Sequence, residues 1–191
     1  MDRTRAKGYN FNAMVSQPKL HILLPCKEIE ATVSRLAAEI ERDYHAKNPI
    51  FIGILKGSFM FLADLLRRLD FPLEVEFIGV SSYGRGTESS GNLRVLKGLG
   101  SPIKGRDVLL IEDIVDTGLT TGFVLEYLSK KKPASLKLCA LLDKPSRRRV
   151  PIKIDYLGLT VPNKFLVGYG LDLNEHFRNL PDIYFVEEDW W

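Results

Sequence analysis

One stretch of the chain decides its fold class: Val108-Leu-Leu-Ile-Glu-Asp-Ile-Val-Asp-Thr-Gly-Leu-Thr-Thr-Gly122. It begins as an apolar run suited to a buried strand, which leads into the adjacent carboxylates of Glu112 and Asp113 and then into Asp116. A Thr/Gly turn follows and opens a helix. This order predicts acids beside a row of backbone N–H groups, which suits the phosphate and the hydroxyl groups of a phosphorylated sugar. The alternative is a loop of solvated acids that caps a helix.

The size and composition of the chain are those of one ordinary globular domain. It has 191 residues, of which 45% are hydrophobic and 27% charged, so we expect a single domain over residues 1–191. The formal net charge of +3 is compatible with an anionic small molecule and does not by itself indicate a nucleic-acid partner. The basic runs Lys130-Lys131-Lys132 and Arg147-Arg148-Arg149 are expected to be solvated ends of elements.

The cysteines and histidines argue against a disulfide framework and a structural zinc site. Cys26 and Cys139 lie far apart, which is typical of free thiols in a reducing compartment, and the three histidines have no paired metal-ligand spacing. The N-terminus lacks an apolar run of signal-peptide length, and the sequence has no run of eighteen apolar residues. We therefore predict a cytoplasmic protein with no membrane partner.

Alternating hydrophobic patterns predict an α/β fold. Short apolar runs predict strands, and apolar residues at helical spacing predict amphipathic helices. Such alternation favours a mostly parallel sheet with helices on both faces. The strands are expected at 50–55, 73–83, 93–99, 107–114, 136–142 and 156–161, and the helices at 26–44, 59–69 and 120–132.

Two turns are expected at the edge of this sheet where ligands bind, outside the carboxyl ends of the strands. They are Lys56-Gly57-Ser58 and the segment from Glu112 to Thr121. The polar segment 84–92 joins two expected strands as a long-looped hairpin, and such loops are often functional lids. Neither a Rossmann fingerprint nor a P-loop motif is present.

The pattern from Glu112 to Thr120 resembles the phosphoribosyl-diphosphate motif of the type I phosphoribosyltransferases. Within that family, the chain from about residue 20 to about residue 186 is similar to the hypoxanthine-guanine phosphoribosyltransferases in particular. The resemblance implies the α/β fold of that family, with a small hood from the two ends of the chain and a long flexible hairpin loop that includes Ser82 and Tyr83. It also implies a non-proline cis peptide at Lys56-Gly57. The matching segments, in order, are Leu55-Lys56-Gly57, Ser82-Tyr83, Lys144, 164–172 and 174–178.

The resemblance implies a purine salvage enzyme. Its reaction would transfer the 5-phosphoribosyl group from phosphoribosyl diphosphate to hypoxanthine, guanine or both, giving IMP or GMP and pyrophosphate, with Mg²⁺ as cofactor. Asp116 would be the general base or acid at N7 of the purine. The ribose and its 5′-phosphate would be bound by Glu112, Asp113, Asp116, Thr117, Gly118, Leu119 and Thr120.

The remaining site residues follow from the same resemblance. Lys56, Gly57 and Arg178 would bind pyrophosphate, although Lys56 alone is equally compatible with a solvated lysine at a helix start. Lys144 would donate to the purine O6 and Phe165 would stack on the ring, although Phe165 taken singly suits the core better. The implied purine-binding set is Lys144, Lys164, Phe165, Leu166 and Asp172, and the metal ligands are Glu112, Asp113 and Asp172.

Other functions remain open at this point. A regulatory protein with the same pocket would bind RNA or DNA, and we would then expect a large basic face or an added domain. A pyrimidine or adenine transferase is the rival among enzymes, and Lys144 with the 164–172 segment favours 6-oxopurines over both. The preference among hypoxanthine, guanine and xanthine stays open. By resemblance the chain is expected to form a homodimer or homotetramer.

Overall fold

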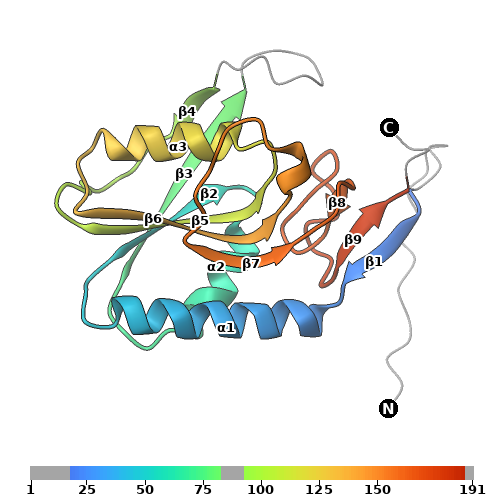
Figure 1. The fold of residues 1–191 in the computed structure, drawn as a ribbon, viewed down its shortest axis with the longest axis horizontal. Helices are drawn as coiled ribbons and strands as arrows, with labels where there is room; N and C mark the ends of the chain where they lie inside the picture. Colours follow the sequence, from blue (N-terminus) through green and yellow to red (C-terminus); the bar gives the residue numbers. More distant parts are fainter. Residues whose placement is uncertain (1–17, 83–92, 188–191) are drawn as a thin grey trace.

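A computed structural model describes residues 18–82 and 93–187 (Figure 1). Helices and strands alternate along most of the chain, as their hydrophobic patterns predict. The elements are β1 (Leu20–Leu24), α1 (Cys26–Tyr44), β2 (Ile50–Leu55), α2 (Phe59–Leu66), β3 (Glu74–Ser82), β4 (Leu93–Lys97), β5 (Asp107–Val115), α3 (Leu119–Ser129), β6 (Ser135–Asp143), the 3₁₀ turn η1 (Pro145–Arg147), β7 (Tyr156–Thr160), β8 (Leu166–Val167) and β9 (Ile183–Val186).

A six-stranded sheet in the order β4-β3-β2-β5-β6-β7 forms the centre of the molecule. The pairs β2–β3, β2–β5, β5–β6 and β6–β7 are parallel, while β4 runs antiparallel to β3 as the predicted hairpin requires. Helices α1 and α2 cover one face and α3 covers the other (Figure 1). The predicted fold class, a mostly parallel sheet flanked by helices, is confirmed.

Strand β5 lies at the centre of this sheet because its residues are apolar on both faces. Leu109 and Ile111 pack with the core under α1 and α2, whereas Val108 and Leu110 pack with the core under α3. All four side chains are fully buried. Continuous apolar runs are expected of parallel strands covered on both sides, and they hold the end of β5 rigidly in place.

A second, smaller sheet joins the two ends of the chain, in the order β1-β9-β8. Its register pairs Leu20 with Val186 and Leu166 with Phe185. The backbone N–H of Cys26 donates to the Asp182 carboxylate at 2.7 Å, which ties the start of α1 to this sheet. The sheet is the small hood that the resemblance implies, and it stands beside the ends of β6 and β7 (Figure 1).

Several expected boundaries need correction. The second helix ends at Leu66, three residues earlier than the pattern indicates. Helix α3 ends at Ser129, because Lys132 has a left-handed backbone and Pro133 cannot continue a helix. Ser82 is the last residue of β3. Tyr83 and the rest of the expected loop lie outside the described residues, as do residues 1–17 and the tail 188–191.

The described residues also bear on the cysteines and the membrane. Cys26 and Cys139 are both free, and burial raises the pKa of the Cys139 thiol. Within residues 18–82 and 93–187, no helix combines the length and apolar character that crossing a membrane requires. The cytoplasmic location stays a prediction.

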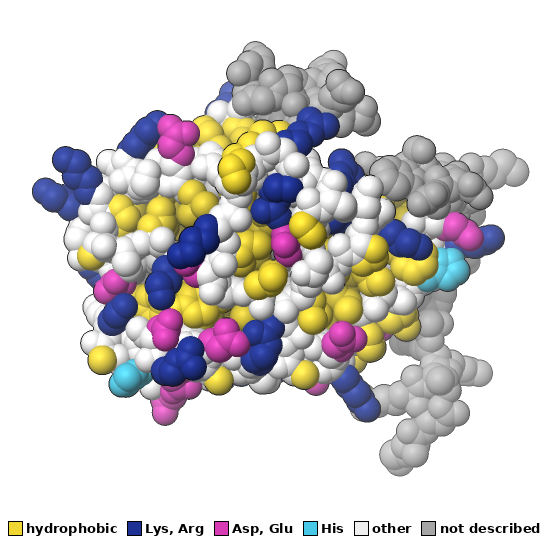
Figure 2. All heavy atoms as spheres, in the orientation of Figure 1, with side chains coloured by type: hydrophobic (Ala, Val, Ile, Leu, Met, Phe, Trp, Pro, Cys, Tyr) yellow, Lys and Arg dark blue, Asp and Glu magenta, His cyan; other side chains and the backbone are white. Residues whose placement is uncertain are grey.

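The surface carries charges of both signs. On the face shown in Figure 2, Lys and Arg side chains alternate with Asp and Glu side chains.

Candidate functional site

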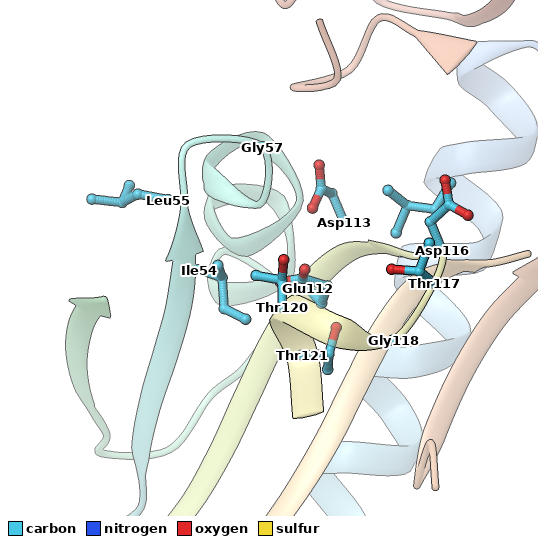
Figure 3. Close-up of a pocket in the computed structure, with 11 residues that line it drawn as sticks. Ile54, Leu55, Gly57, Glu112, Asp113, Asp116, Thr117, Gly118, Thr120 and Thr121 are labelled. Atoms are coloured by element: carbon cyan, nitrogen blue, oxygen red, sulfur yellow. The ribbon is translucent and has the colours of Figure 1, made fainter. Parts of the chain in front are cut away.

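The strands β2, β5, β6 and β7 end at one edge of the sheet, and a cavity of about 180 Å³ lies there (Figure 3). Its walls come from the end of β2, the end of β5 and the start of α3. The lining includes Gly57, Glu112, Asp113, Asp116, Gly118 and Thr120. The two turns that the sequence places at the ligand edge therefore meet in one cavity.

Glu112 and Asp113 are neighbours in β5, but their side chains lie on different sides of the sheet. Glu112 lies near Thr120 at the start of α3, whereas the Asp113 carboxylate lies against the turn at Gly57 (Figure 3). This is the normal alternation of a strand. The two acids therefore contact different parts of whatever occupies the cavity.

The carboxyl groups of Glu112 and Asp113 are both largely shielded from solvent. Glu112 is 6% exposed, and its Oε2 has no hydrogen-bond partner among the described residues. Burial raises the pKa of Glu112 well above its usual range, and the charge of Asp113 adds to the rise. Burial also raises the pKa of Asp113 to about 6, although backbone N–H groups and Arg178 oppose the shift. Two desolvated acids, of which Glu112 has an oxygen without a partner, favour a ligand that brings hydroxyl donors or a cation.

The loop from Asp116 to Gly118 leads into the N-terminus of α3. Gly118 has φ +83°, a left-handed conformation that glycine adopts without strain, and it is the N-cap residue. The first amides of a helix have no carbonyl partner within it, so they and the helix dipole favour an anion. The Thr117 carbonyl accepts from the backbone N–H groups of Arg149 and Val150 at 2.8 and 3.2 Å, which fixes the loop from the outside.

Asp116 lies between two cations. Its carboxylate is 3.6 Å from the Nζ of Lys144 and 3.3 Å from the Nε of Arg147. Arg148 holds the loop that begins at Asp116, because its Nε donates to the Asp116 carbonyl at 3.1 Å and its guanidinium also pairs with Asp143. The catalytic candidate is therefore fixed through both its side chain and its backbone.

Lys144 follows β6 directly and is 4% exposed. Its Nζ donates to the carbonyl of Lys164 at 2.9 Å. Burial lowers the pKa of Lys144, and the charge of Asp116 opposes that shift. An ammonium group has three donors, and these contacts leave it a donor for a further acceptor.

The turn after β2 packs tightly against the β5 acids. The cis peptide bond lies between Leu55 and Lys56, one residue earlier than the resemblance implies. A Cβ at Gly57 would overlap the Asp113 carboxylate, so only glycine allows this approach. The Nζ of Lys56 forms an ion pair with the Oε1 of Glu175 at 2.9 Å.

Arg178 joins the acids of the C-terminal segment. Its Nη1 donates to the Gly170 carbonyl at 2.7 Å, and its Nη2 lies 2.8 Å from Asp172 and 3.1 Å from Glu175. The second oxygen of Asp172 accepts from the backbone N–H of Glu175 at 2.8 Å. Lys56, which lies far from Asp172 and Arg178 in sequence, is thus joined to them in one charged network through Glu175.

The expected purine-binding segment runs from the end of β7 into the hood. Leu166 is buried in β8, and the Phe165 carbonyl accepts from the Val186 backbone N–H at 2.9 Å. The Nζ of Lys164 lies 3.8 Å from the centre of the Phe185 ring, so Lys164 reaches Lys144 through its carbonyl and not through its side chain. The roles of these residues toward a purine stay predictions.

Comparison with known proteins identifies the family. The sequence model of the protein family described as the phosphoribosyl transferase domain matches residues 21–174. The hypoxanthine-guanine phosphoribosyltransferase of Aquifex aeolicus is 51% identical over 171 residues, which are 89% of this chain and 96% of that protein. The chain belongs to the hypoxanthine-guanine phosphoribosyltransferase family.

Further relatives agree with this assignment. The hypoxanthine-guanine phosphoribosyltransferase of Bacillus subtilis is 46% identical over 162 residues, 85% of this chain and 90% of that protein. The crystal structure of a hypoxanthine phosphoribosyltransferase from Staphylococcus aureus has a TM-score of 0.85 at 43% identity and covers 94% of this chain and 98% of that one. The family inferred from the resemblance is confirmed.

Sequence reasoning missed three residues of this phosphoribosyltransferase site. Glu175 was not considered, and Arg147 and Arg148 were expected to be solvated. The expectation holds for the exposed Arg149 but is wrong for Arg148, whose side chain is 17% exposed and hydrogen-bonded under the loop. Arg147 and Arg148 follow β6 closely, at the carboxyl edge of the sheet, and this position was the signal that could have found these two arginines.

Proposed function

We propose that the protein transfers the 5-phosphoribosyl group from phosphoribosyl diphosphate to hypoxanthine, guanine or both, giving IMP or GMP and pyrophosphate. Family membership supports this activity. The observation that carries it is the cavity in which the β5 acids face the N-terminus of α3. We assign the site residues that follow on the same basis.

The 5′-phosphate would lie in the loop of Asp116, Thr117, Gly118, Leu119 and Thr120. Backbone N–H groups at the start of α3 would donate to its oxygens, and the helix dipole would favour its charge. The 148–150 segment holds this loop in place, so the amides need little rearrangement when the phosphate binds.

The ribose hydroxyls would meet Glu112 and Asp113. Glu112 presents an unpartnered buried oxygen to the cavity, which a hydroxyl donor would satisfy. Burial raises the pKa of Asp113 and the charge of Asp172 adds to the rise, so a divalent cation shared by these two acids would relieve their repulsion.

The acids expected to hold Mg²⁺ are Glu112, Asp113 and Asp172. Asp113 and Asp172 interact electrostatically and could share one ion, whereas the side chain of Glu112 lies on the other side of the sheet. Within residues 18–82 and 93–187 no three acids, histidines or cysteines form a complete metal site by themselves. Mg²⁺ is commonly bound by one or two carboxylates together with substrate oxygens, so such a partial site is what it requires. When bound, the ion would neutralise charge on the diphosphate oxygens.

The base would lie beyond Asp116, between Lys144 and the 165–166 segment. Lys144 would donate to O6 of a 6-oxopurine, and a 6-amino group offers no acceptor there. Phe165 would stack on the ring, the Leu166 backbone would meet its edge, and the Lys164 carbonyl would hold Lys144 in place. Asp116 would take the proton from N7, for which a positioned base contributes roughly 10²–10⁴-fold.

Bond breaking leaves a cationic ribose and an anionic pyrophosphate. The carboxylates of Glu112 and Asp113 lie where the cationic sugar would form. Lys56 and Arg178 are the cations placed to bind the departing pyrophosphate, with Gly57 allowing the turn to approach. The site therefore separates the two developing charges onto groups of opposite sign.

Steady-state rates test the proposal directly. Hypoxanthine, guanine, xanthine and adenine would each be offered with phosphoribosyl diphosphate, with and without Mg²⁺. We expect turnover of hypoxanthine, guanine or both, loss of that turnover without the metal, and no comparable rate with adenine. Absence of turnover with every 6-oxopurine, or an adenine rate equal to theirs, would contradict the assignment.

We also propose that the chain forms a homodimer or homotetramer, as its family likeness implies. Light scattering coupled to size-exclusion chromatography would measure the mass, and a monomer at assay concentration would refute the proposal.

A further inference from the structure

The carboxylate of Glu175 bridges two cations that come from distant parts of the chain. Its Oε1 accepts from the Nζ of Lys56 at 2.9 Å, and its Oε2 accepts from the Nη2 of Arg178 at 3.1 Å. One oxygen thus serves each cation. Lys56 and Arg178 are also the two groups that the proposed function assigns to pyrophosphate, so Glu175 occupies the same donors as the product anion.

Stability does not explain the half of this bridge that Lys56 forms. The side chains of Lys56 and Glu175 are 64% and 62% exposed, and ion pairs with that much solvent around them contribute little to folding. The backbone of Glu175 nevertheless has φ +67°, which non-glycine residues rarely adopt, and its N–H is bound by Asp172. The local structure therefore directs Glu175 toward the two cations at the expense of backbone conformation.

We propose that Glu175 is an internal competitor of pyrophosphate, which weakens the binding of that product and helps to release it. The inference rests on the proposed function. The charges of Lys56 and Arg178 are balanced by those of Glu175 and Asp172, so the cations carry no surplus charge for an anion while Glu175 holds them. A diphosphate offers more charge and more oxygens than one carboxylate, and it displaces Glu175 when it binds.

Simple competition predicts the size of the effect. If the two cations are free of Glu175 only part of the time, the apparent dissociation constant of pyrophosphate rises by the inverse of that fraction. The same competition acts on the diphosphate of the incoming substrate. A nucleoside 5′-monophosphate does not use these cations, and its binding is unaffected.

The test is a charge-removing, isosteric substitution, Glu175→Gln. We expect magnesium pyrophosphate to bind this variant about two- to tenfold more tightly in calorimetry, the range that one or two exposed ion pairs give. The product-inhibition constant of pyrophosphate falls by the same factor, while that of IMP stays as in the parent protein. Glu126→Gln is the matched control, because Glu126 is 67% exposed and ion-paired, with Lys130 on α3.

Each remaining outcome decides against the inference. Pyrophosphate binding that is unchanged or weaker in Glu175→Gln, or equally tightened in Glu126→Gln, overturns it. Lys56→Ala separates this failure from that of the proposed function. If Lys56→Ala weakens pyrophosphate binding and Glu175→Gln leaves it unchanged, only the role of Glu175 is wrong. If neither substitution changes it, the pyrophosphate site is also misplaced.

Discussion

Replacing Gly118 with alanine adds one methyl group at the turn where β5 gives way to α3. Gly118 has φ +83°, so any other residue there is strained. The new Cβ would also lie 2.7 Å from the Val150 carbonyl oxygen and 2.9 Å from Ile152 Cγ1, closer than real side chains approach. Gly105 has a similar φ of +71°, but a Cβ there meets nothing within 4 Å. The two glycines thus form a natural pair that separates backbone strain from steric overlap.

The magnitudes follow from these contacts. Left-handed backbone in a non-glycine residue costs about 1–2 kcal/mol, and this cost is common to both positions. The overlap at Gly118 forces the 148–150 segment away from the loop, and such forced shifts in packed regions cost about 1–3 kcal/mol. The entropy that alanine removes from the unfolded chain is the same at both sites and cancels in the comparison. We therefore expect Gly118→Ala to reduce the free energy of unfolding by about 1–3 kcal/mol more than Gly105→Ala does.

Urea denaturation of the parent and both variants measures this difference, provided that the slopes agree. Calorimetric titration with phosphoribosyl diphosphate then shows whether the displaced loop has lost its phosphate contacts, which we expect only for Gly118→Ala. Equal losses of stability in the two variants would refute the reasoning, because the contact with Val150 would then be soft and Gly118 would be present only for its φ.

Three further predictions concern the charged groups of the site. Lys144→Gln should lower kcat/KM for hypoxanthine by about 10–100-fold, since it replaces a charged hydrogen bond to O6, and the adenine rate measured beside it should not fall. Asp116→Asn should lower kcat by roughly 10²–10⁴-fold with little change in KM for the diphosphate substrate, and a KM effect alone would remove Asp116 from proton transfer. The pKa of Asp113 is raised from 3.8 to about 6 on folding, so its contribution to stability is present below pH 3.8 and is lost as the pH rises through about 6. Asp113→Asn should therefore become more stable relative to the parent over that interval, and parallel pH profiles in denaturation would contradict it.

The central sheet and its ligand edge were predictable because their signals are local. The apolar run before Glu112 is typical of a buried strand, and the turn at Thr117–Gly118 follows shortly after it. A parallel sheet brings the carboxyl ends of its strands together, so residues after several strands meet without any contact being known in advance. Lys56 was found by that rule and by the family resemblance, and Lys144 by the resemblance alone.

The hood was not predictable as strands, because its signal is not local. β8 has two residues and β9 has four, too few for alternation to stand out. The sheet exists because β1 and β9 come from opposite ends of the chain and pair Leu20 with Val186. Long-range pairing of this kind leaves no trace in a short window of sequence.

The ion pairs around the site were missed for a related reason. A run of three arginines looks solvated, yet the 3₁₀ turn after β6 brings Arg148 under the loop and leaves Arg149 exposed. Neighbouring positions of one run thus differ in burial because of tertiary packing alone. Glu175 was likewise missed because its partner in the site, Lys56, lies 119 residues earlier in the sequence.

The two sides of the site differ in exposure, and this difference matches what each must do. Lys144 is 4% exposed, and in such surroundings a single misplaced polar group is costly, which is how a site discriminates between bases that differ in one exocyclic atom. Lys56 and Glu175 are more than 60% exposed, where ion pairs are weak and exchange readily. A highly charged product held by buried cations would leave slowly. We therefore expect selection of the base where water is excluded, and exchange of pyrophosphate where water weakens the contact of Lys56; Arg178, whose side chain is 19% exposed, is the less solvated of the two pyrophosphate cations.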